Sequence, residues 1–306
     1  MTQSTRVLGI DPGLNTTGYG VLDFARGGPR LVPDRAHRLG PLVTSAGHDS
    51  CFREENSVFV SASTTCFPGL SVVDAIDRLN DLEFSAVNIA IHHANPELTP
   101  ARVAEDLERA VSYCRDTHRL DIAGYSIDIN AMGDEHYEQF AACCKLAKAT
   151  KVVSLTVPSA ELGTPFNEEV EHLRRLVQIA TLEGTLVSIR TQIGRLSEDA
   201  DTVVVLCDNV EGLGVTLDPS TFVCGPHAKR GYDKLLGYVY DVELRDTSKD
   251  AFQVRVGQGE IEYSRLITQL RRSKYNRALN VRMTPMEGTE HNSEMRKIRL
   301  LLESLL

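Results

Sequence analysis

The 306-residue sequence has neither an excess of positive charge nor a long apolar run. Lys and Arg number 33 against 42 Asp and Glu, which gives a formal net charge of −9. Because this balance provides no general attraction to phosphate backbones, we expect no nucleic-acid partner. No apolar run approaches the roughly 18 residues that span a bilayer, and residues 1–6 lead into a strand-like run rather than a signal-peptide core. We therefore expect a cytoplasmic protein without a membrane partner.

The cysteines likewise lack any CxxC pair, and their number is odd. Most of them lie in apolar surroundings, which is typical of buried, reduced thiols in a cytosolic protein. The seven positions are Cys51, Cys66, Cys114, Cys143, Cys144, Cys207 and Cys224.

From residue 57 onward, short β-branched runs alternate with longer amphipathic stretches, a pattern that predicts a parallel sheet with crossover helices. Eight strands are predicted, at residues 57–63, 86–91, 122–129, 152–157, 186–189, 214–217, 238–244 and 278–283. Helices are predicted at residues 71–82, 100–119, 134–149, 167–183, 199–209 and 263–274, and a further amphipathic helix near the carboxyl end. Thr99 before Pro100 is a predicted N-cap, and Gly184 is a predicted helix end.

Eight such cycles in a chain of this length predict a (β/α)8 TIM barrel of about 250 residues with an appendage. Residues 24–56 are rich in Gly and Pro without sustained periodicity, and we interpret them as a linker or irregular extension. The predicted organisation is an N-terminal extension over residues 1–50 and the barrel over residues 51–306.

The N-terminal extension opens with the motif GIDPGLNTTGYGVLD at residues 9–23, which predicts a β-hairpin carrying the carboxylate of Asp11. Over residues 7–23 the motif resembles the first hairpin of the Holliday-junction resolvase family. The resemblance implies a DNA endonuclease that holds two divalent cations with several carboxylates, so Asp11 would need partners. Residues 24–150 contain no matching acidic strand motif. The alternative is a hairpin without nuclease activity.

Four motifs in the rest of the chain point to a second family: CFPGLSVVDAIDRL, LGVTLDPSTF, YVYDVELRDT and VGQGEIEYSRLI. Together, residues 57–306 resemble the xylose isomerase-like TIM barrels, the group of sugar phosphate isomerases and epimerases. In barrels of this shape the chemistry lies at the carboxyl ends of the strands. The resemblance implies one divalent metal, such as Mn²⁺ or Mg²⁺, held by three acids and a histidine at these ends.

The positions that match the family's metal ligands read Arg190, Asp218, Glu243 and Arg282. Arginine keeps its proton and has no lone pair for a metal, so both arginines remove a ligand and add repulsion. We therefore expect no metal cofactor. Two guanidinium groups facing two carboxylates predict a bidentate ion-pair network in its place.

The leading functional prediction is an isomerase- or epimerase-like barrel with a degenerate metal site that acts on, or binds, a small polyhydroxylated carbohydrate or sugar acid. Whether it is an enzyme stays open. The predicted catalytic acids and bases are Asp218, Glu243 and Asp241, and the predicted substrate-binding residues are Arg190, Arg282, His92 and Arg245. For His92 a purely structural role is the alternative.

Two further functions compete with this prediction: a non-catalytic barrel that binds a carbohydrate or an anion, and a DNA endonuclease through Asp11. A homo-oligomer is compatible with the sequence. Asp246 is interpreted as an ion-pair partner at a strand end.

Overall fold

The computed structural model describes residues 5–12, 17–25, 28–31 and 58–306. The chain falls into two compact units that divide between Phe52 and Arg53. The predicted boundary between residues 50 and 51 lies outside the described residues, as does Cys51.

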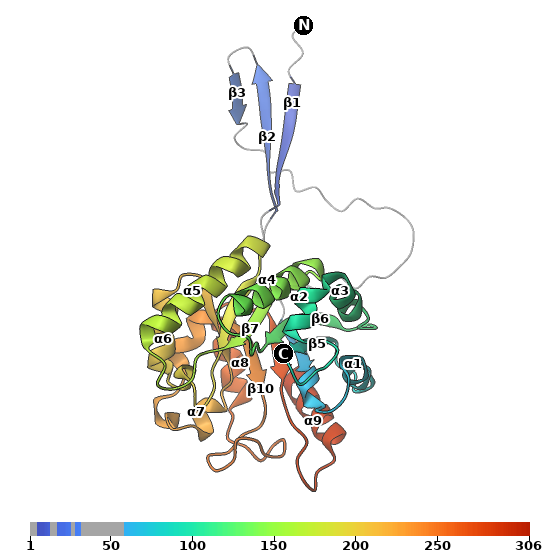
Figure 1. Cartoon of the computed structure of the whole chain (residues 1–306), viewed down its shortest axis with the longest axis vertical. Coiled ribbons are helices and arrows are strands. Elements are labelled where there is room, and N and C mark those ends of the chain that lie inside the picture. Colours follow the sequence, from blue (N-terminus) through green and yellow to red (C-terminus); the bar gives the residue numbers. More distant parts are fainter. Residues whose placement is uncertain (1–4, 13–16, 26–27, 32–57) are drawn as a thin grey trace. The chain divides into compact units, whose positions relative to one another are not determined.

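The larger unit is a closed barrel of eight parallel strands wrapped by helices (Figure 1), which confirms the predicted (β/α)8 TIM barrel. Around the barrel the strands follow one another in chain order, and the last pairs with the first. The strands are β4 (Phe59–Ser63), β5 (Ala86–Ile91), β6 (Asp121–Ile127), β7 (Ser154–Pro158), β8 (Leu186–Arg190), β9 (Leu213–Leu217), β10 (Val239–Leu244) and β11 (Ala278–Val281).

The helices begin and end close to the predicted positions, apart from the segment over residues 100–119 and a four-residue helix after β9 that the sequence does not predict. They are α1 (Val72–Asp81), α2 (Pro100–Glu105), α3 (Leu107–Arg115), α4 (Asp134–Ala149), α5 (Phe166–Glu183), α6 (Ala200–Asn209), α7 (Thr221–Cys224), α8 (Tyr263–Arg272) and α9 (His291–Glu303). The Thr99 hydroxyl caps α2 by accepting the Arg102 N–H, and Gly184 ends α5 with a φ of 73°. Both predicted helix ends are thus confirmed. None of the described helices is long and apolar enough to cross a membrane.

The single helix predicted over residues 100–119 is wrong, because the segment forms two helices. Asp106 leaves helical geometry, with a φ of −143°, and its carboxylate accepts the backbone N–H of Arg109 at 2.9 Å. A short acidic side chain that bonds nearby backbone in this way competes with helix continuation.

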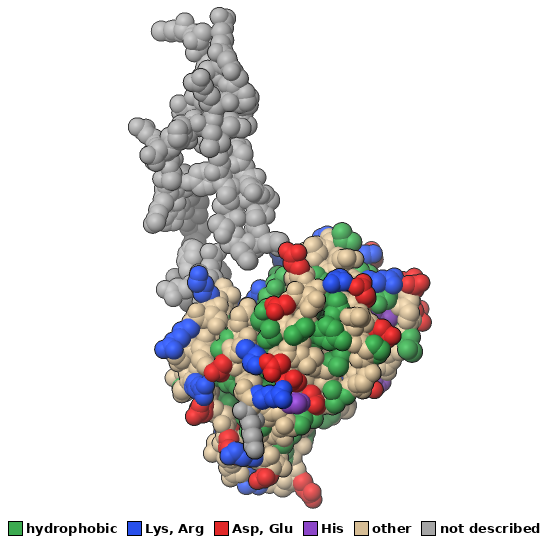
Figure 2. Space-filling view, turned by 90° about the vertical axis from the view of Figure 1, so that its left-hand side faces the viewer, with side chains coloured by type: hydrophobic (Ala, Val, Ile, Leu, Met, Phe, Trp, Pro, Cys, Tyr) green, Lys and Arg blue, Asp and Glu red, His purple; other side chains and the backbone are tan. Residues whose placement is uncertain are grey.

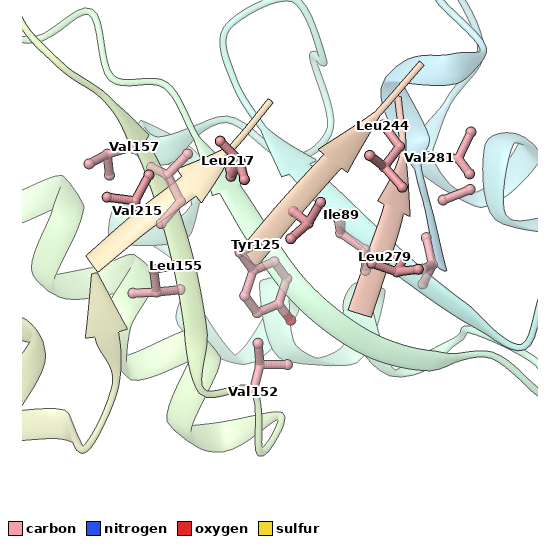
Figure 3. Packing of buried hydrophobic residues seen from close by; sticks show 14 of the residues in the cluster. Ile89, Tyr125, Val152, Leu155, Val157, Val215, Leu217, Leu244, Leu279 and Val281 are labelled. Atoms are coloured by element: carbon pink, nitrogen blue, oxygen red, sulfur yellow. The ribbon is translucent and has the colours of Figure 1, made fainter. Parts of the chain in front are cut away.

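The strands turn apolar side chains outward to the helices and small polar side chains into the barrel interior. Figure 3 shows part of the outer layer, including Leu155, Val215 and Leu279, all fully buried. Inside, the Thr156 and Thr216 hydroxyls meet at 2.8 Å although β8 separates their strands. The alternation of side chains along each strand therefore directs polar groups into the interior and toward the carboxyl-terminal mouth.

The smaller unit contains an antiparallel three-stranded sheet of β1 (Thr5–Pro12), β2 (Thr17–Ala25) and β3 (Gly28–Leu31). The pairing of β1 with β2, which sets Asp11 opposite Gly18, confirms the predicted hairpin. The strand β3 corrects the interpretation of residues 28–31 as irregular. The resolvase resemblance stays a prediction, since a hairpin alone does not show it.

Candidate ligand-binding site at the barrel mouth

Six of the seven predicted site residues lie on or directly after four consecutive strands, β8 to β11. Arg190 ends β8, Asp218 follows β9, Asp241 and Glu243 lie on β10, and Arg282 follows β11. Residues two apart on a strand share a face, so Asp241, Glu243 and Arg245 form one ascending row toward the mouth.

The structure brings Arg190, Glu243 and Arg282 together in one ion-pair network. Nε of Arg190 donates to Oε2 of Glu243 at 2.9 Å, and a terminal nitrogen of Arg282 donates to the same oxygen at 2.8 Å. The Glu243 side chain is fully buried, whereas the Arg282 side chain remains 28% exposed. Arg282 is therefore the arginine that solutes in the mouth can reach.

The carboxyl group of Glu243 is held ionised by these arginines. Burial alone would raise its pKa, but the guanidinium groups of Arg190, Arg282 and Arg245 outweigh burial and lower the pKa to about 2. Its second oxygen, Oε1, is buried without a hydrogen-bond partner among the described residues. Glu243 is thus a weak base near neutral pH with one free acceptor atom.

Asp218 is fixed from several directions at once. Its Oδ2 accepts from Arg245 at 2.7 Å and its Oδ1 accepts from the Ser220 N–H at 3.0 Å, while its own N–H donates to the Thr191 hydroxyl at 2.8 Å. The carboxylate is 2% exposed, and both of its oxygens are engaged, Oδ2 in a buried ion pair and Oδ1 in a backbone hydrogen bond.

Arg245 lies under an aromatic cover. Its guanidinium carbon is 4.6 Å from the centroid of the Phe252 ring, which lies in the loop after β10, and its side chain is 10% exposed. Nε of Arg245 has no partner among residues 58–306. The guanidinium group is therefore held between a carboxylate and an aromatic face, and direct contact with a substrate, as the sequence predicts, would require Phe252 to move aside.

Asp241 lies deeper in the barrel than Glu243. Burial and the charge of Glu243 raise its pKa to about 7, against the opposing effects of the Val242 N–H, Arg277 and Arg190. Its protonated form is therefore favoured compared with that of an ordinary aspartate.

His92 follows β5, which only β4 separates from β11 in the barrel, and its side chain is half-buried. Burial, His93 and Arg282 lower its pKa, and Asp128 opposes them, so its ring is neutral near pH 7. Nδ1 accepts the Ala94 N–H at 3.2 Å. The structure does not place His92 in the ion-pair network but in the wall of an adjoining pocket.

Asp246 organises the loop after β10, so its interpretation as an ion-pair partner is wrong. Its carboxylate accepts the backbone N–H groups of Thr247, Gly257 and Gly259 at 3.2, 2.7 and 3.1 Å. A Cβ at position 259 would lie 2.0 Å from Oδ1 of Asp246, so this approach requires glycine.

The residues at the metal-ligand positions do not fit a divalent cation. Two of the four are guanidinium groups, which have no lone pair for a metal, and both donate to Oε2 of Glu243. No group of three or more His, Cys, Asp or Glu that could hold a metal is found among the residues that the structure describes.

With Arg245 included, three guanidinium groups face the two carboxylates of Asp218 and Glu243, and the carboxyl group of Asp241 lies within electrostatic reach of Arg190. On the outer surface, acidic and basic side chains are interspersed on the part of the face that Figure 2 shows in colour.

The fold matches solved structures of the xylose isomerase-like barrels and related sugar epimerases. A xylose isomerase-like TIM barrel protein from Mycobacterium smegmatis, determined in complex with magnesium, aligns with a TM-score of 0.64 and 14% identity, over 81% of this chain and 96% of that one. 3-Keto-D-glucoside 4-epimerase from E. coli aligns with a TM-score of 0.61 and 12% identity, over 81% of this chain and 99% of that one. A probable 3-DHS dehydratase from Bacillus anthracis aligns with a TM-score of 0.60 and 13% identity, over 80% of this chain and 98% of that one.

No protein-family model matches the sequence, and no curated protein matches it. At these identities the structural matches show the fold that the chain shares with these enzymes, and the chemistry has to be argued from its own residues.

Sequence reasoning missed three residues of the site. Phe252 covers Arg245, and Thr191 and Ser220 hold Asp218. Thr191 and Ser220 lie next to or near predicted strand ends and could have been found there, whereas Phe252 lies in a loop whose path no local pattern reveals.

Proposed function

We propose that the protein binds a small anionic carbohydrate, a sugar acid or sugar phosphate, at the barrel mouth without a divalent metal. The observation that carries this proposal is the convergence of Arg190 and Arg282 on one oxygen of Glu243, where the related fold would place metal ligands. An anion that enters the mouth meets the guanidinium group of Arg282, whose side chain is 28% exposed.

Two buried atoms without partners support a polyhydroxylated ligand. Oε1 of Glu243 can accept a hydroxyl hydrogen, and Nε of Arg245 can donate to a hydroxyl oxygen. Each atom costs free energy while it stays unpaired, so a ligand that satisfies both gains affinity. Both atoms are enclosed, and Arg282 and Phe252 are the side chains that would have to move.

Binding is favoured over proton transfer because neither Glu243 nor Asp218, the two carboxylates nearest the mouth, is available as a general base. Glu243 has a pKa of about 2, far from the value that suits a general base near pH 7, and Asp218 is bonded through both oxygens.

A second candidate is metal-independent isomerisation or epimerisation with Asp241 as the base. The observation that favours it is the Asp241 pKa of about 7, which suits acid–base chemistry. Asp241 is only 4% exposed, so Glu243 would have to move before a substrate reached it. The endonuclease alternative through Asp11 stays a prediction.

Isothermal titration of the full chain with D-glucuronate, D-gluconate, D-glucose 6-phosphate and neutral D-glucose tests the proposal. We expect saturable binding of at least one anion, unaffected by EDTA, and none of glucose. Arg282→Gln should weaken this binding by about tenfold or more, since it removes a charge-assisted contact. Arg272→Gln, an equal charge change at the far end of α8, should not. The proposal would be overturned if glucose bound as tightly as the anion, or if Arg282→Gln bound the anion as tightly as the wild-type protein.

Turnover is followed separately, by NMR in D2O with the sugar that binds. If a carbon-bound hydrogen next to a carbonyl exchanges with deuterium, and Asp241→Asn abolishes this exchange, metal-independent isomerisation or epimerisation is established instead.

A further inference from the structure

A pocket of about 140 Å³ lies between the loop after β4 and the loop after β5, and His92 forms part of its wall. Its lining residues all fall within residues 64–95 and do not include the ion-pair network. Arg282 follows β11 and His92 follows β5, and only β4 separates these two strands. The charge of Arg282 helps to lower the pKa of His92, so a ligand held at Arg282 lies on the same side of the mouth as this pocket.

The pocket wall is mainly apolar, with Phe67, Leu70, Val72 and Ala94 among its lining residues. The Leu70 side chain is 45% exposed although it is aliphatic, so burial against a ligand would be favourable.

The hydroxyl groups in the wall are already engaged. The Thr64 hydroxyl accepts the Ala90 N–H at 3.0 Å, the Thr65 hydroxyl meets that of Ser63 at 2.9 Å, and the Ser71 hydroxyl donates to Asp74 at 2.7 Å. These groups shape the loop after β4 and the start of α1.

His92 and Asn95 supply the other polar side chains of the wall. Oδ1 of Asn95 accepts the Glu97 N–H at 3.2 Å. Since Nδ1 of His92 accepts the Ala94 N–H, the proton of the neutral ring resides on Nε2. No hydrogen bond of Nε2 is found among residues 58–306, although the ring is half-buried. The pocket thus offers the N–H of His92, with the amide of Asn95, beside an apolar wall.

We propose that this pocket binds a small acyl group, such as the acetyl of an acetamido substituent, on the anionic carbohydrate. Nε2–H of His92 donates to the acyl carbonyl oxygen, and the methyl group packs against Phe67 and Leu70. At about 30 Å³ for each water-sized group, the volume holds four to five heavy atoms, and an acetamido group has four. This inference rests on the proposed function and narrows its ligand to acylated amino sugars that carry an acid or a phosphate.

The test compares two ligands with the same phosphate, N-acetyl-D-glucosamine 6-phosphate and D-glucose 6-phosphate, by isothermal titration of the full chain. We expect the acetylated ester to bind about tenfold more tightly. Ala94→Leu fills the pocket from an exposed position and should abolish this preference. Ala101→Leu, the same change on the exposed side of α2, is the control. His92→Phe should reduce the preference without filling the pocket.

Each outcome separates the two proposals. Equal affinity of the wild-type protein for the two esters, or an unchanged preference in Ala94→Leu, overturns the acyl pocket while anion binding stands. Binding of neither ester, together with no binding of the sugar acids, overturns both.

Discussion

Replacing Glu243 by glutamine tests the ion-pair network through the stability of the barrel. The change keeps the shape of the side chain and removes the negative charge between Arg190 and Arg282. A Glu243 pKa of about 2 in place of its ordinary 4.5 corresponds to about 3 kcal/mol of stability at neutral pH. Breaking a buried ion pair by removing one partner costs about 3–5 kcal/mol, because the other charge stays buried. In Glu243→Gln, the charge of Arg190, whose side chain is 10% exposed, stays buried without its carboxylate partner.

The pH dependence distinguishes this cause from a packing defect. Because the folded-state pKa of Glu243 is depressed, its contribution is complete above about pH 4.5 and is lost as the pH falls toward 2. The difference between wild type and Glu243→Gln should therefore shrink at about pH 3.

The assay is equilibrium urea unfolding followed by far-UV circular dichroism, since the chain has no Trp. Glu171→Gln, which removes a carboxylate from the exposed pair with Arg174, is the control and should shift the midpoint little. The reasoning is refuted if Glu243→Gln unfolds at the wild-type urea concentration at neutral pH, or if its deficit is the same in acid.

Two further variants test the interior acid and the loop. Asp241 has a raised pKa, so the unfolded chain ionises first and stability falls as the pH rises from about 3.8 to about 7. Asp241→Asn should remove this fall, as measured by urea midpoints at about pH 5 and pH 8. If the stability of Asp241→Asn fell with pH as that of the wild type does, the raised pKa of Asp241 would be contradicted. Asp246→Asn places an amide group opposite backbone N–H donors, which should lower the free energy of unfolding by about 1–3 kcal/mol. Hydrogen exchange at Gly257 and Gly259 should accelerate, whereas Asp250→Asn, in the same loop, should leave it slow. Slow exchange in Asp246→Asn would refute the anchoring role.

The strands and most helices of the barrel could be predicted from the sequence because each rests on a local periodicity. The helix over residues 134–149 has the predicted bounds, since its apolar positions repeat without a competing cap. The segment over residues 100–119 departs from its prediction because one carboxylate, that of Asp106, bonds the backbone and outweighs the repeat.

The site could be predicted only in part, since strand ends follow from topology while partners follow from side-chain geometry. The barrel fold alone places Arg190, Glu243 and Arg282 at one mouth. That both arginines bond the same oxygen, and that Arg245 pairs with Asp218 under Phe252, depends on loop paths that no local pattern encodes.

The central claim is that guanidinium groups occupy the place of a metal at the mouth. Isothermal titration of Mn²⁺ and Mg²⁺ into the full chain, with the metal content of the purified protein, tests it most directly. We expect no saturable binding at the mouth by the wild-type protein, and stoichiometric binding by Arg190→Glu/Arg282→Glu, which supplies four carboxylates. Tight stoichiometric binding by the wild type, lost in Asp218→Asn, would contradict the account.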